Sequence, residues 1–284
     1  MSNILIAGCG ELGNLLGHKL SQAGHKVWGL RRNAQAVRVP IQPIQADLLA
    51  IESLQQLPKH LDYVFYMPAA DGFNDQAYCD CYVRGLNNIL QALQEQNQNL
   101  KRFFFISSTC VYSQNEGEWV DEETATPPKH FTGIRHLEAE NLALSSAYPA
   151  TVVRFAGIYG PSRARFLKEV LSGRAKMHEN PVYSNRIHIE DCTGVLEHLM
   201  SLKDPQELYL AVDSAPTLEN EILSWLADQL FLPEPEYADS ISERLRSNKR
   251  CKNQRLIDSG YQFLYPTYKE GLENVIAQME EDEE

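Results

Sequence analysis

The turn Gly8-Cys9-Gly10-Glu11-Leu12-Gly13 follows an apolar run at Asn3–Ala7 and opens an amphipathic stretch at Glu11–Gln22. In a G-x-G-x-x-G turn between a strand and a helix, each glycine has a structural role that a larger residue could not fill. Gly8 permits the tight turn, Gly10 lets the backbone approach a pyrophosphate, and Gly13 lets the helix pack close to the sheet. The N–H groups at the helix start carry partial positive charge and suit a diphosphate. The turn therefore predicts a dinucleotide site, with a purely structural turn as the alternative. Its candidate cofactor-binding residues are Gly8, Gly10, Glu11, Leu12 and Gly13.

The first half of the chain alternates short apolar runs with longer amphipathic stretches. This is the pattern of βαβ units that feed a parallel sheet, whose strands are apolar almost throughout when helices cover both faces. The expected strands are residues 3–7, 26–30, 43–46, 62–67, 102–107 and 151–155. The expected helices are residues 11–22, 75–96 and 131–146, the last two with apolar spacings of three and four. We predict an α/β fold of the Rossmann type, with a doubly wound parallel sheet.

The strict alternation stops after Gly157-Ile158-Tyr159-Gly160-Pro161, and the rest of the chain carries shorter, more irregular elements. We therefore expect a dinucleotide-binding domain at residues 1–160 and a smaller C-terminal lobe, mainly for substrate, at residues 161–284. A helix near Glu190-Asp191 and a strand at residues 207–212 indicate that the chain returns to the sheet near residues 186–212. The run Pro233-Glu234-Pro235-Glu236 indicates a loop within the second lobe.

Two arginines, Arg31 and Arg32, follow the second expected strand, where an NAD site usually has an acidic residue for the ribose 2′-hydroxyl. No acidic residue occurs between Glu11 and Asp47. A ribose 2′-phosphate carries close to two negative charges, and the planar guanidinium fork matches it well. Arg31 and Arg32 therefore favour NADP over NAD, with solvated loop charges as the alternative.

The chain has 284 residues, 43% apolar and 23% charged, which is an ordinary globular composition. Its 26 basic and 38 acidic residues give a net charge of −12. The terminal run 280–284 is wholly acidic, and we expect it to be a solvated, frayed end. Nucleic-acid binding depends on phosphate neutralisation by Lys and Arg, so an acidic balance without a basic stripe argues against DNA or RNA as a partner.

The six cysteines are scattered without C-x-x-C spacing, so neither a disulfide framework nor a metal site is expected. No basic segment precedes the first strand, and no apolar run reaches the roughly 18 residues that a membrane span needs. We therefore expect a soluble, cytoplasmic protein that does not associate with membranes.

Several separated segments resemble the extended short-chain dehydrogenase/reductase family, which includes sugar-nucleotide epimerases and dehydratases. Besides the glycine turn, the similar segments are residues 46–48, 67–70, 106–112, 154–161 and 185–191, in the family's order. The resemblance implies that Asp47 hydrogen-bonds the adenine and that Ala69 and Ala70 line the cofactor cleft beside the nicotinamide ribose. It puts Ser108 where the family keeps a Ser or Thr that hydrogen-bonds a substrate hydroxyl or carbonyl. The alternative for Ser108 is a hydroxyl that caps local backbone.

The family's acid–base chemistry rests on Tyr-x-x-x-Lys on a helix, where residues four apart share a face and the cation lowers the Tyr pKa. Aligned on Leu137-Glu138-Ala139-Glu140, the Tyr position is Thr132 and the Lys position is His136. One residue earlier, the pair is Phe131 and Arg135. A Thr hydroxyl does not titrate near neutrality, so His136 is the candidate proton carrier, alone or through Thr132. The alternatives are Arg135 on the nicotinamide ribose or an anionic substrate, and an exposed helix face for both.

This pattern, with the cofactor half intact and the acid–base half replaced, is similar to the atypical, epimerase/dehydratase-like members of the family. The favoured function is an NADP(H)-dependent oxidoreductase or epimerase that acts on a small carbonyl or hydroxyl compound, sugar nucleotides included. Its catalytic residues would be Ser108, Thr132 and His136. The alternative is a catalytically inactive NADP(H)-binding sensor or regulatory module. We expect a small-molecule substrate and a monomer or homodimer, and NAD is the alternative cofactor.

Overall fold

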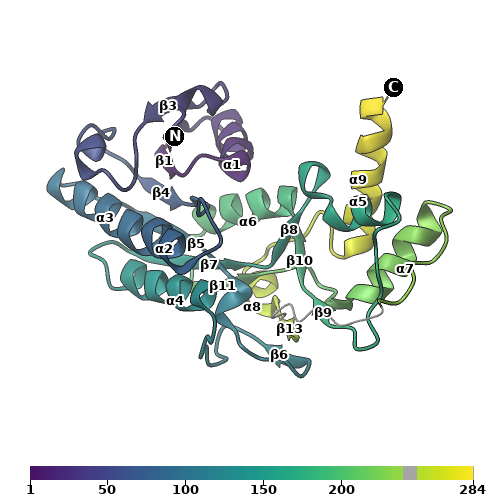
Figure 1. The fold of residues 1–284 in the computed structure, drawn as a ribbon. Helices are drawn as coiled ribbons and strands as arrows, with labels where there is room; N and C mark the ends of the chain where they lie inside the picture. Colours follow the sequence, from purple (N-terminus) through teal and green to yellow (C-terminus); the bar gives the residue numbers. More distant parts are fainter. Residues whose placement is uncertain (239–247, 284) are drawn as a thin grey trace. The chain divides into compact units, whose positions relative to one another are not determined.

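The computed structural model describes residues 1–238 and 248–283. The chain forms a seven-stranded parallel sheet in the order β11-β7-β5-β4-β1-β2-β3 (Figure 1). The strands are β1 (Asn3–Ala7), β2 (Lys26–Arg31), β3 (Gln42–Gln45), β4 (Tyr63–Tyr66), β5 (Arg102–Ser108), β7 (Ala150–Phe155) and β11 (Leu208–Ala211). Each expected strand lies within one or two residues of an observed one. The predicted Rossmann-like α/β fold is confirmed.

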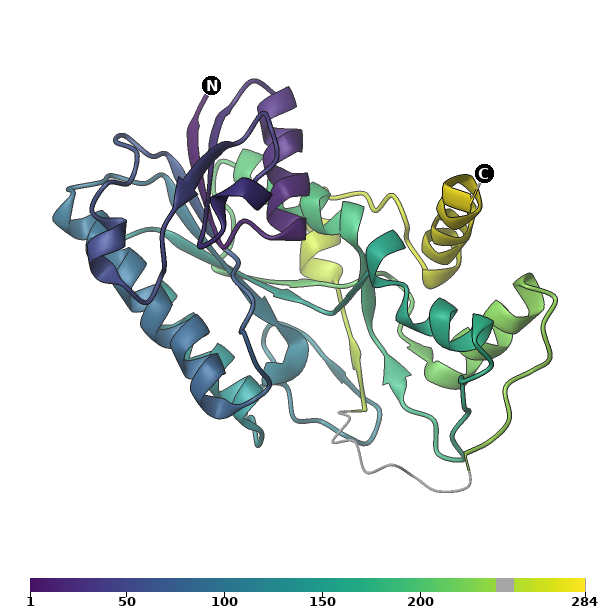
Figure 2. The ribbon, with the colours of Figure 1, turned by 45° about the horizontal axis from the view of Figure 1, so that its top comes forward.

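Helices cover both faces of this sheet (Figures 1 and 2). On one face, α3 (Gly85–Glu95) and α4 (Phe131–Leu144) pack on side chains that include Leu5 and Phe105. On the other face lie α1 (Glu11–Gln22) and α6 (Ile189–Ser201), which an ion pair of 3.1 Å between Lys19 and Glu197 connects. Successive side chains of a strand point to opposite faces of the sheet. Because helices cover both faces, the side chains on both sides of the central strands are apolar.

The strand order reverses at β1, which pairs with β2 on one edge and with β4 on the other. In an open parallel sheet, loops leave such a switch point in opposite directions and open a crevice at the carboxyl ends of the strands. The glycine turn at residues 8–13 follows β1 directly. The topology therefore puts this turn at the crevice.

The helix expected at residues 75–96 is interrupted. It consists of α2 (Asp75–Tyr78), a π-helical turn at Cys79–Arg84, and α3. The Tyr66 hydroxyl donates to the Cys81 carbonyl at 2.5 Å, and a Cβ at Gly85 would lie 2.7 Å from that hydroxyl oxygen. A side chain that takes a helix carbonyl in this way widens the turn. The apolar spacing alone does not reveal this break.

The chain divides into two compact units. Unit 1 comprises residues 1–112, 126–154 and 193–209, and unit 2 comprises residues 113–125, 155–192 and 210–284. The short strands of unit 2 pair as β8 (Gly157–Tyr159) with β10 (Arg186–His188), β9 (Tyr183–Ser184) with β12 (Thr217–Leu218), and β6 (Glu118–Val120) with β13 (Lys249–Cys251). Its helices are α5 (Arg165–Leu171), α7 (Glu219–Gln229), α8 (Gln254–Asp258) and α9 (Tyr268–Glu283).

The charge of the acidic run 280–284 predicts a frayed end. In the structure, α9 instead continues through this run to Glu283. Leu272 and Val275 anchor the earlier turns of α9 in the core of unit 2. Glu is a good helix former, so the helix extends from this anchor into the acidic run. Within residues 1–238 and 248–283, no helix is long and apolar enough to cross a membrane.

Candidate functional site

Gly8 follows β1 in a left-handed conformation, with a φ of +87°. Its N–H and that of Cys9 both donate to the Leu30 carbonyl at 3.0 Å, which ties the turn to β2. A Cβ at Gly8 would lie 2.4 Å from the Pro68 nitrogen, so no side chain fits there. The loop after β4 therefore passes directly against the glycine turn.

The other two glycines of the turn have opposite surroundings. A Cβ at Gly10 would meet nothing closer than the Gly8 carbonyl oxygen at 4.0 Å, whereas one at Gly13 would lie 3.0 Å from the Ile6 side chain. Gly10 is the N-cap of α1 and has no side chain with which to cap it. The space beside Gly10 and the partial positive charge of the helix start fit a pyrophosphate.

Asn14 holds this turn from within α1 and is a residue that the sequence analysis missed. Its side-chain amide donates to the carbonyls of Gly10 at 2.8 Å and Ala36 at 3.2 Å. Its carbonyl oxygen accepts from the Arg38 N–H at 2.7 Å. An Asn on an otherwise apolar helix face is the signal that could have revealed it, because buried amides need hydrogen-bond partners.

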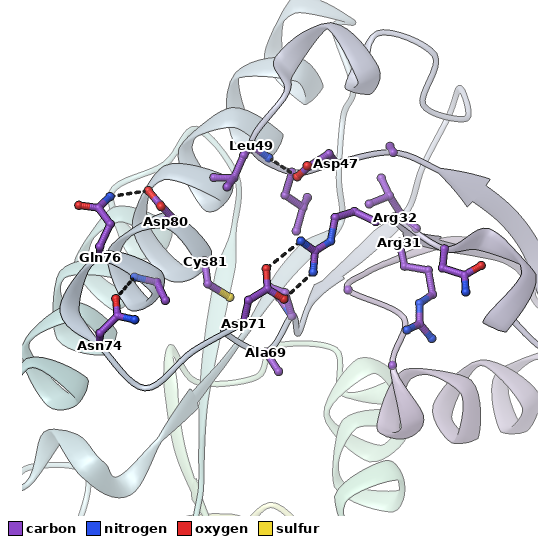
Figure 3. A pocket seen from close by; sticks show the side chains of 18 residues that line it. Arg31, Arg32, Asp47, Leu49, Ala69, Asp71, Asn74, Gln76, Asp80 and Cys81 are labelled. Carbon is purple, nitrogen blue, oxygen red and sulfur yellow. Dashed lines mark hydrogen bonds and ion pairs between the residues drawn. The ribbon is translucent and has the colours of Figure 1, made fainter.

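A cavity of about 570 Å³ opens at this turn, entirely within unit 1 (Figure 3). Its walls come from the turn and from the loops after β2, β3 and β4, together with the start of the helical segment at Asn74–Cys81. Among the predicted cofactor-binding residues, the cavity is lined by Gly8, Gly10, Arg31, Arg32, Asp47 and Ala69. Glu11, Leu12, Gly13 and Ala70 are not in its lining.

The two arginines lie differently (Figure 3). Arg31 lies over the glycine turn, where its Nη1 is 3.4 Å from the Cys9 carbonyl oxygen. Arg32 points away from the turn and forms a two-point ion pair with Asp71, a residue that sequence reasoning did not single out. Both arginines line the cavity, and the charge of Arg32 is paired there with that of Asp71.

The residues that the resemblance assigns to adenine and ribose lie in the loops after β3 and β4. Asp47 stabilises its own loop, since its carboxylate accepts from the Leu49 N–H at 2.9 Å and its N–H donates to Ser53 Oγ at 3.0 Å. Ala69 is exposed on the cavity wall. Ala70 follows Ala69 in the same loop and is partly buried against the core beneath the sheet's helices.

Ser108 and Thr132 come from neighbouring elements. Ser108 ends β5, and its Oγ accepts from the Cys110 N–H at 3.2 Å, which is the local capping that the sequence left open. Gly133 lets α4 approach this segment, because a Cβ there would lie 2.4 Å from the Cys110 carbonyl oxygen. The start of α4, with Thr132, therefore packs against the turn that follows Ser108.

Thr132 and His136 do not share one hydrogen-bond chain. Thr132 Oγ1 lies 3.0 Å from His130 Nδ1. His136 is buried, with its ring centroid 4.1 Å from that of Tyr82, and its Nδ1 has no hydrogen-bond partner among the described residues. Burial lowers the pKa of His136 to about 4. At neutral pH its ring is therefore uncharged, and the exposed helix face weighed for His136 is wrong.

Arg135, the alternative anion-binding residue, is already paired. Its guanidinium donates to both carboxylate oxygens of Asp75, at 2.8 and 2.9 Å, and to Glu138 at 2.8 Å. Asp75 begins α2 and Glu138 lies one turn further along α4. In this structure Arg135 therefore connects α2 to α4.

A buried ionic network fixes α4 to the sheet beside Ser108. Arg154 on β7 donates to the Glu140 carboxylate at 2.6 and 2.9 Å, and to the Tyr112 hydroxyl at 2.7 Å. Ser107 Oγ donates to the same carboxylate at 2.5 Å. The sequence does not reveal the pairing of Glu140 with Arg154, because a contact across the fold leaves no local pattern.

Comparison with known proteins agrees with this geometry. The profile of the NAD dependent epimerase/dehydratase family matches residues 4–193, which is most of the chain. The chain belongs to this family. Among curated proteins, the comparison found no match.

Solved structures of epimerase/dehydratase type superpose on nearly the whole chain. A proposed NAD-dependent epimerase/dehydratase from Methylobacillus flagellatus has 37% sequence identity and a TM-score of 0.84, with 98% of this chain and 99% of that one covered. UDP-glucose 4-epimerase from Thermotoga maritima, solved with UDP-glucose, has 18% identity and a TM-score of 0.83, covering 99% and 100%. MoeE5, solved with UDP-glucose and NAD, has 20% identity and a TM-score of 0.82, also covering 99% and 100%.

In this member of the epimerase/dehydratase family, the two halves of the site differ. The dinucleotide half keeps the tight turn, the open glycine and a cavity lined by Arg31 and Arg32 together with three aspartates. The expected acid–base half has a buried His136 ring at the end that would carry the proton, and Arg135, from the alternative alignment, is paired with Asp75 and Glu138.

Proposed function

We propose that this protein is an NADP(H)-dependent oxidoreductase or epimerase that acts on a small carbonyl or hydroxyl compound of the sugar-nucleotide class. The observation that carries the proposal is the cavity at the glycine turn, with open space at Gly10 and the start of α1 beside it. Such a helix start binds a diphosphate through its backbone N–H groups. Arg31 and Arg32, which line this cavity, support NADP over NAD, because a guanidinium group can bind a 2′-phosphate.

Several residues would hold the dinucleotide. Gly8, Gly10, Glu11, Leu12 and Gly13 form the turn for the pyrophosphate, Asp47 would hydrogen-bond the adenine, and Ala69 and Ala70 would leave room for the nicotinamide ribose. When bound, the nicotinamide supplies or accepts the hydride. We further propose that residues 1–160, with the return near 186–212, bind the cofactor and that residues 161–284 bind mainly substrate.

Ser108 and Thr132 would hydrogen-bond the reacting oxygen of the substrate. Their elements pack together where Gly133 approaches Cys110, and a hydroxyl can both donate and accept a hydrogen bond. The proposed proton transfer at His136 meets a constraint, because burial lowers its pKa to about 4. The ring would have to accept a proton from the substrate during reaction rather than hold one beforehand.

The substrate class rests on two neighbours that were solved with UDP-glucose, the epimerase from Thermotoga maritima and MoeE5. The test is turnover of UDP-sugars with NADP⁺ and of a panel of carbonyl compounds with NADPH. Nicotinamide absorbance measures hydride transfer, and product analysis detects sugar isomers. We expect turnover that falls at least tenfold in Ser108→Ala. Full activity in His136→Ala would remove His136 from the mechanism.

Cofactor preference is tested separately by thermal unfolding at equal concentrations of NADP(H) and NAD(H). A ligand that binds only the folded state stabilises it in proportion to the logarithm of its concentration over Kd. We expect the larger shift with NADP(H). An equal or reversed order would contradict the NADP preference without affecting the enzymatic proposal.

A second function is favoured by the surroundings of His136. A neutral, buried ring that packs on Tyr82 suits a protein that binds NADP(H) and transmits its redox state without chemistry. This sensor would bind NADPH and NADP⁺ with different affinities and turn over no substrate of the panel. Efficient turnover of any UDP-sugar or carbonyl compound excludes it.

A further inference from the structure

Arg32 and Asp71 bridge the cofactor cavity. Arg32 follows β2, and Asp71 follows Ala70 in the loop after β4. Nη1 of Arg32 lies 2.7 Å from Oδ2 of Asp71, and Nη2 lies 2.5 Å from Oδ1, so the two side chains meet fork to fork (Figure 3). Because β1 lies between β2 and β4, this bridge joins the two strands that flank the glycine turn.

The bridge is open to solvent and can exchange partners. The Arg32 and Asp71 side chains are 61% and 66% exposed, and both line the cavity. The Arg32 guanidinium holds the pKa of Asp71 below its usual value, so the carboxyl stays ionised at neutral pH. Exposed ion pairs are weak, and a competing anion of higher charge can replace the carboxylate.

The donors that Asp71 occupies are those that a ribose 2′-phosphate needs. A phosphomonoester binds arginine best through two parallel N–H···O bonds, which is the arrangement that Asp71 already uses. The carboxylate would also repel the phosphate if both stayed near the guanidinium. A ribose 2′-hydroxyl meets no such conflict, because it can donate to Asp71 while the ion pair stays intact.

We propose that Asp71 is a specificity-determining positioning residue, which holds Arg32 and competes with the 2′-phosphate of NADP for its two donors. Binding of NADP exchanges the carboxylate for the phosphate, whereas binding of NAD leaves the bridge in place. The loop after β2 lacks the acidic residue that an NAD site usually has there, and Asp71 from the loop after β4 brings a carboxylate to Arg32 instead. The inference rests on the proposed function only in that a dinucleotide binds in this cavity.

The test is calorimetric titration of NADP⁺, NAD⁺, 2′,5′-ADP and 5′-ADP into the wild type, Asp71→Asn, Arg32→Gln and the double variant. The two ADP probes carry the ribose end alone, so the result does not depend on turnover. We expect Asp71→Asn to tighten NADP⁺ and 2′,5′-ADP about five- to tenfold and to change NAD⁺ and 5′-ADP less than twofold. In the Arg32→Gln background, the same change should leave the NADP⁺ to NAD⁺ affinity ratio unaltered.

Asp80→Asn is the matched control. Asp80 lines the same cavity, but its carboxylate is held by Arg84 at 2.6 Å and by Gln76 at 2.9 Å. Its neutralisation should leave the affinity ratio unchanged. An equal gain in Asp80→Asn, a gain that persists without Arg32, or an unchanged ratio in Asp71→Asn would each overturn the role of Asp71.

These outcomes separate the inference from the proposed function. If the wild type prefers NAD⁺ but Asp71→Asn shifts the ratio toward NADP⁺, the NADP preference fails and the role of Asp71 stands. If no probe binds any variant, both fail. Unchanged unfolding midpoints of the ligand-free variants would show that the effects are not general losses of structure.

Discussion

Gly8 and Gly24 have nearly the same backbone conformation in different surroundings. Their φ values are +87° and +85°, but a Cβ at Gly8 would clash with Pro68, whereas one at Gly24 would meet nothing within 4 Å. Replacement by Ala therefore carries the same left-handed strain at both positions and an added backbone clash only at Gly8.

We expect Gly24→Ala to lower the free energy of unfolding by about 1 kcal/mol and Gly8→Ala to lower it by about 3 kcal/mol or more, since overpacking adds to the strain. Urea denaturation of both variants measures this difference. Equal losses would mean that the loop after β4 moves freely away from the turn.

The buried His136 ring makes stability depend on pH. Its pKa is about 4 in the folded protein and 6.5 as a free side chain, so the unfolded chain binds the proton more readily. The stability that the folded protein has while His136 is neutral in both states is fully present above pH 6.5 and is lost as the pH falls through 4. We expect wild type to lose about 3 kcal/mol over this range relative to His136→Phe, which cannot titrate.

The measurement is chemical denaturation of wild type and His136→Phe at several pH values between 7.5 and 4.5. The difference between the two variants carries the prediction, because other titrating groups affect both alike. Parallel pH dependences would show that the His136 ring is accessible to protons in the folded state.

At the scale of elements, the Glu140–Arg154 pair decides where α4 lies against the sheet. Both side chains are at most 5% exposed, so removal of one partner leaves a buried charge without its counterion. We expect Glu140→Gln to lower the free energy of unfolding by about 3 to 5 kcal/mol. Substrate-dependent activity should fall as well, because Ser107 and Ser108 adjoin this network.

Glu138 on the same helix is the control for this prediction. It pairs with Arg135 at 2.8 Å but is 46% exposed. Glu138→Gln should lower the free energy of unfolding by less than about 1 kcal/mol. A similar loss in both variants would mean that burial does not distinguish the two ion pairs.

Elements with a local cause could be predicted from the sequence. The strands around β1 and the bounds of α1 follow from apolar runs and the glycine turn. The π-helical break at Cys79–Arg84 could not, because it depends on Tyr66, which is distant in sequence. The candidate site divides in the same way: Gly8 and Gly10 were predictable, whereas Asp71 and Glu140 act through partners 39 and 14 residues away.

At the scale of the whole molecule, unit 2 has a titrating group of its own. Asp213 is buried, and burial raises its pKa from 3.8 to about 8. The folded state therefore keeps a proton that the unfolded chain releases above pH 4, and stability falls as the pH rises from 4 to 8. Asp213 thus acts in the opposite direction to His136 in unit 1.

We expect the stability of Asp213→Asn, minus that of wild type, to grow by roughly 3 kcal/mol between pH 5 and pH 8. The free energy of unfolding over this range measures it, with probes that follow each unit, such as hydrogen exchange of α7 and of α3. A difference that does not change with pH would show that Asp213 is ionised in the folded protein.

The place of β1 between β2 and β4 also ties the core to the cofactor turn through strand register. A slip of β1 by one residue would turn Ile4 and Ile6 toward α3 and Leu5 toward α1, since alternate side chains face opposite sides. It would also move the position without a side chain away from Pro68. A single insertion within β1 is therefore expected to disrupt both the packing of the sheet and the binding of a dinucleotide. Conversely, a variant with a substitution in β1 that still folds is expected to keep the geometry of the glycine turn.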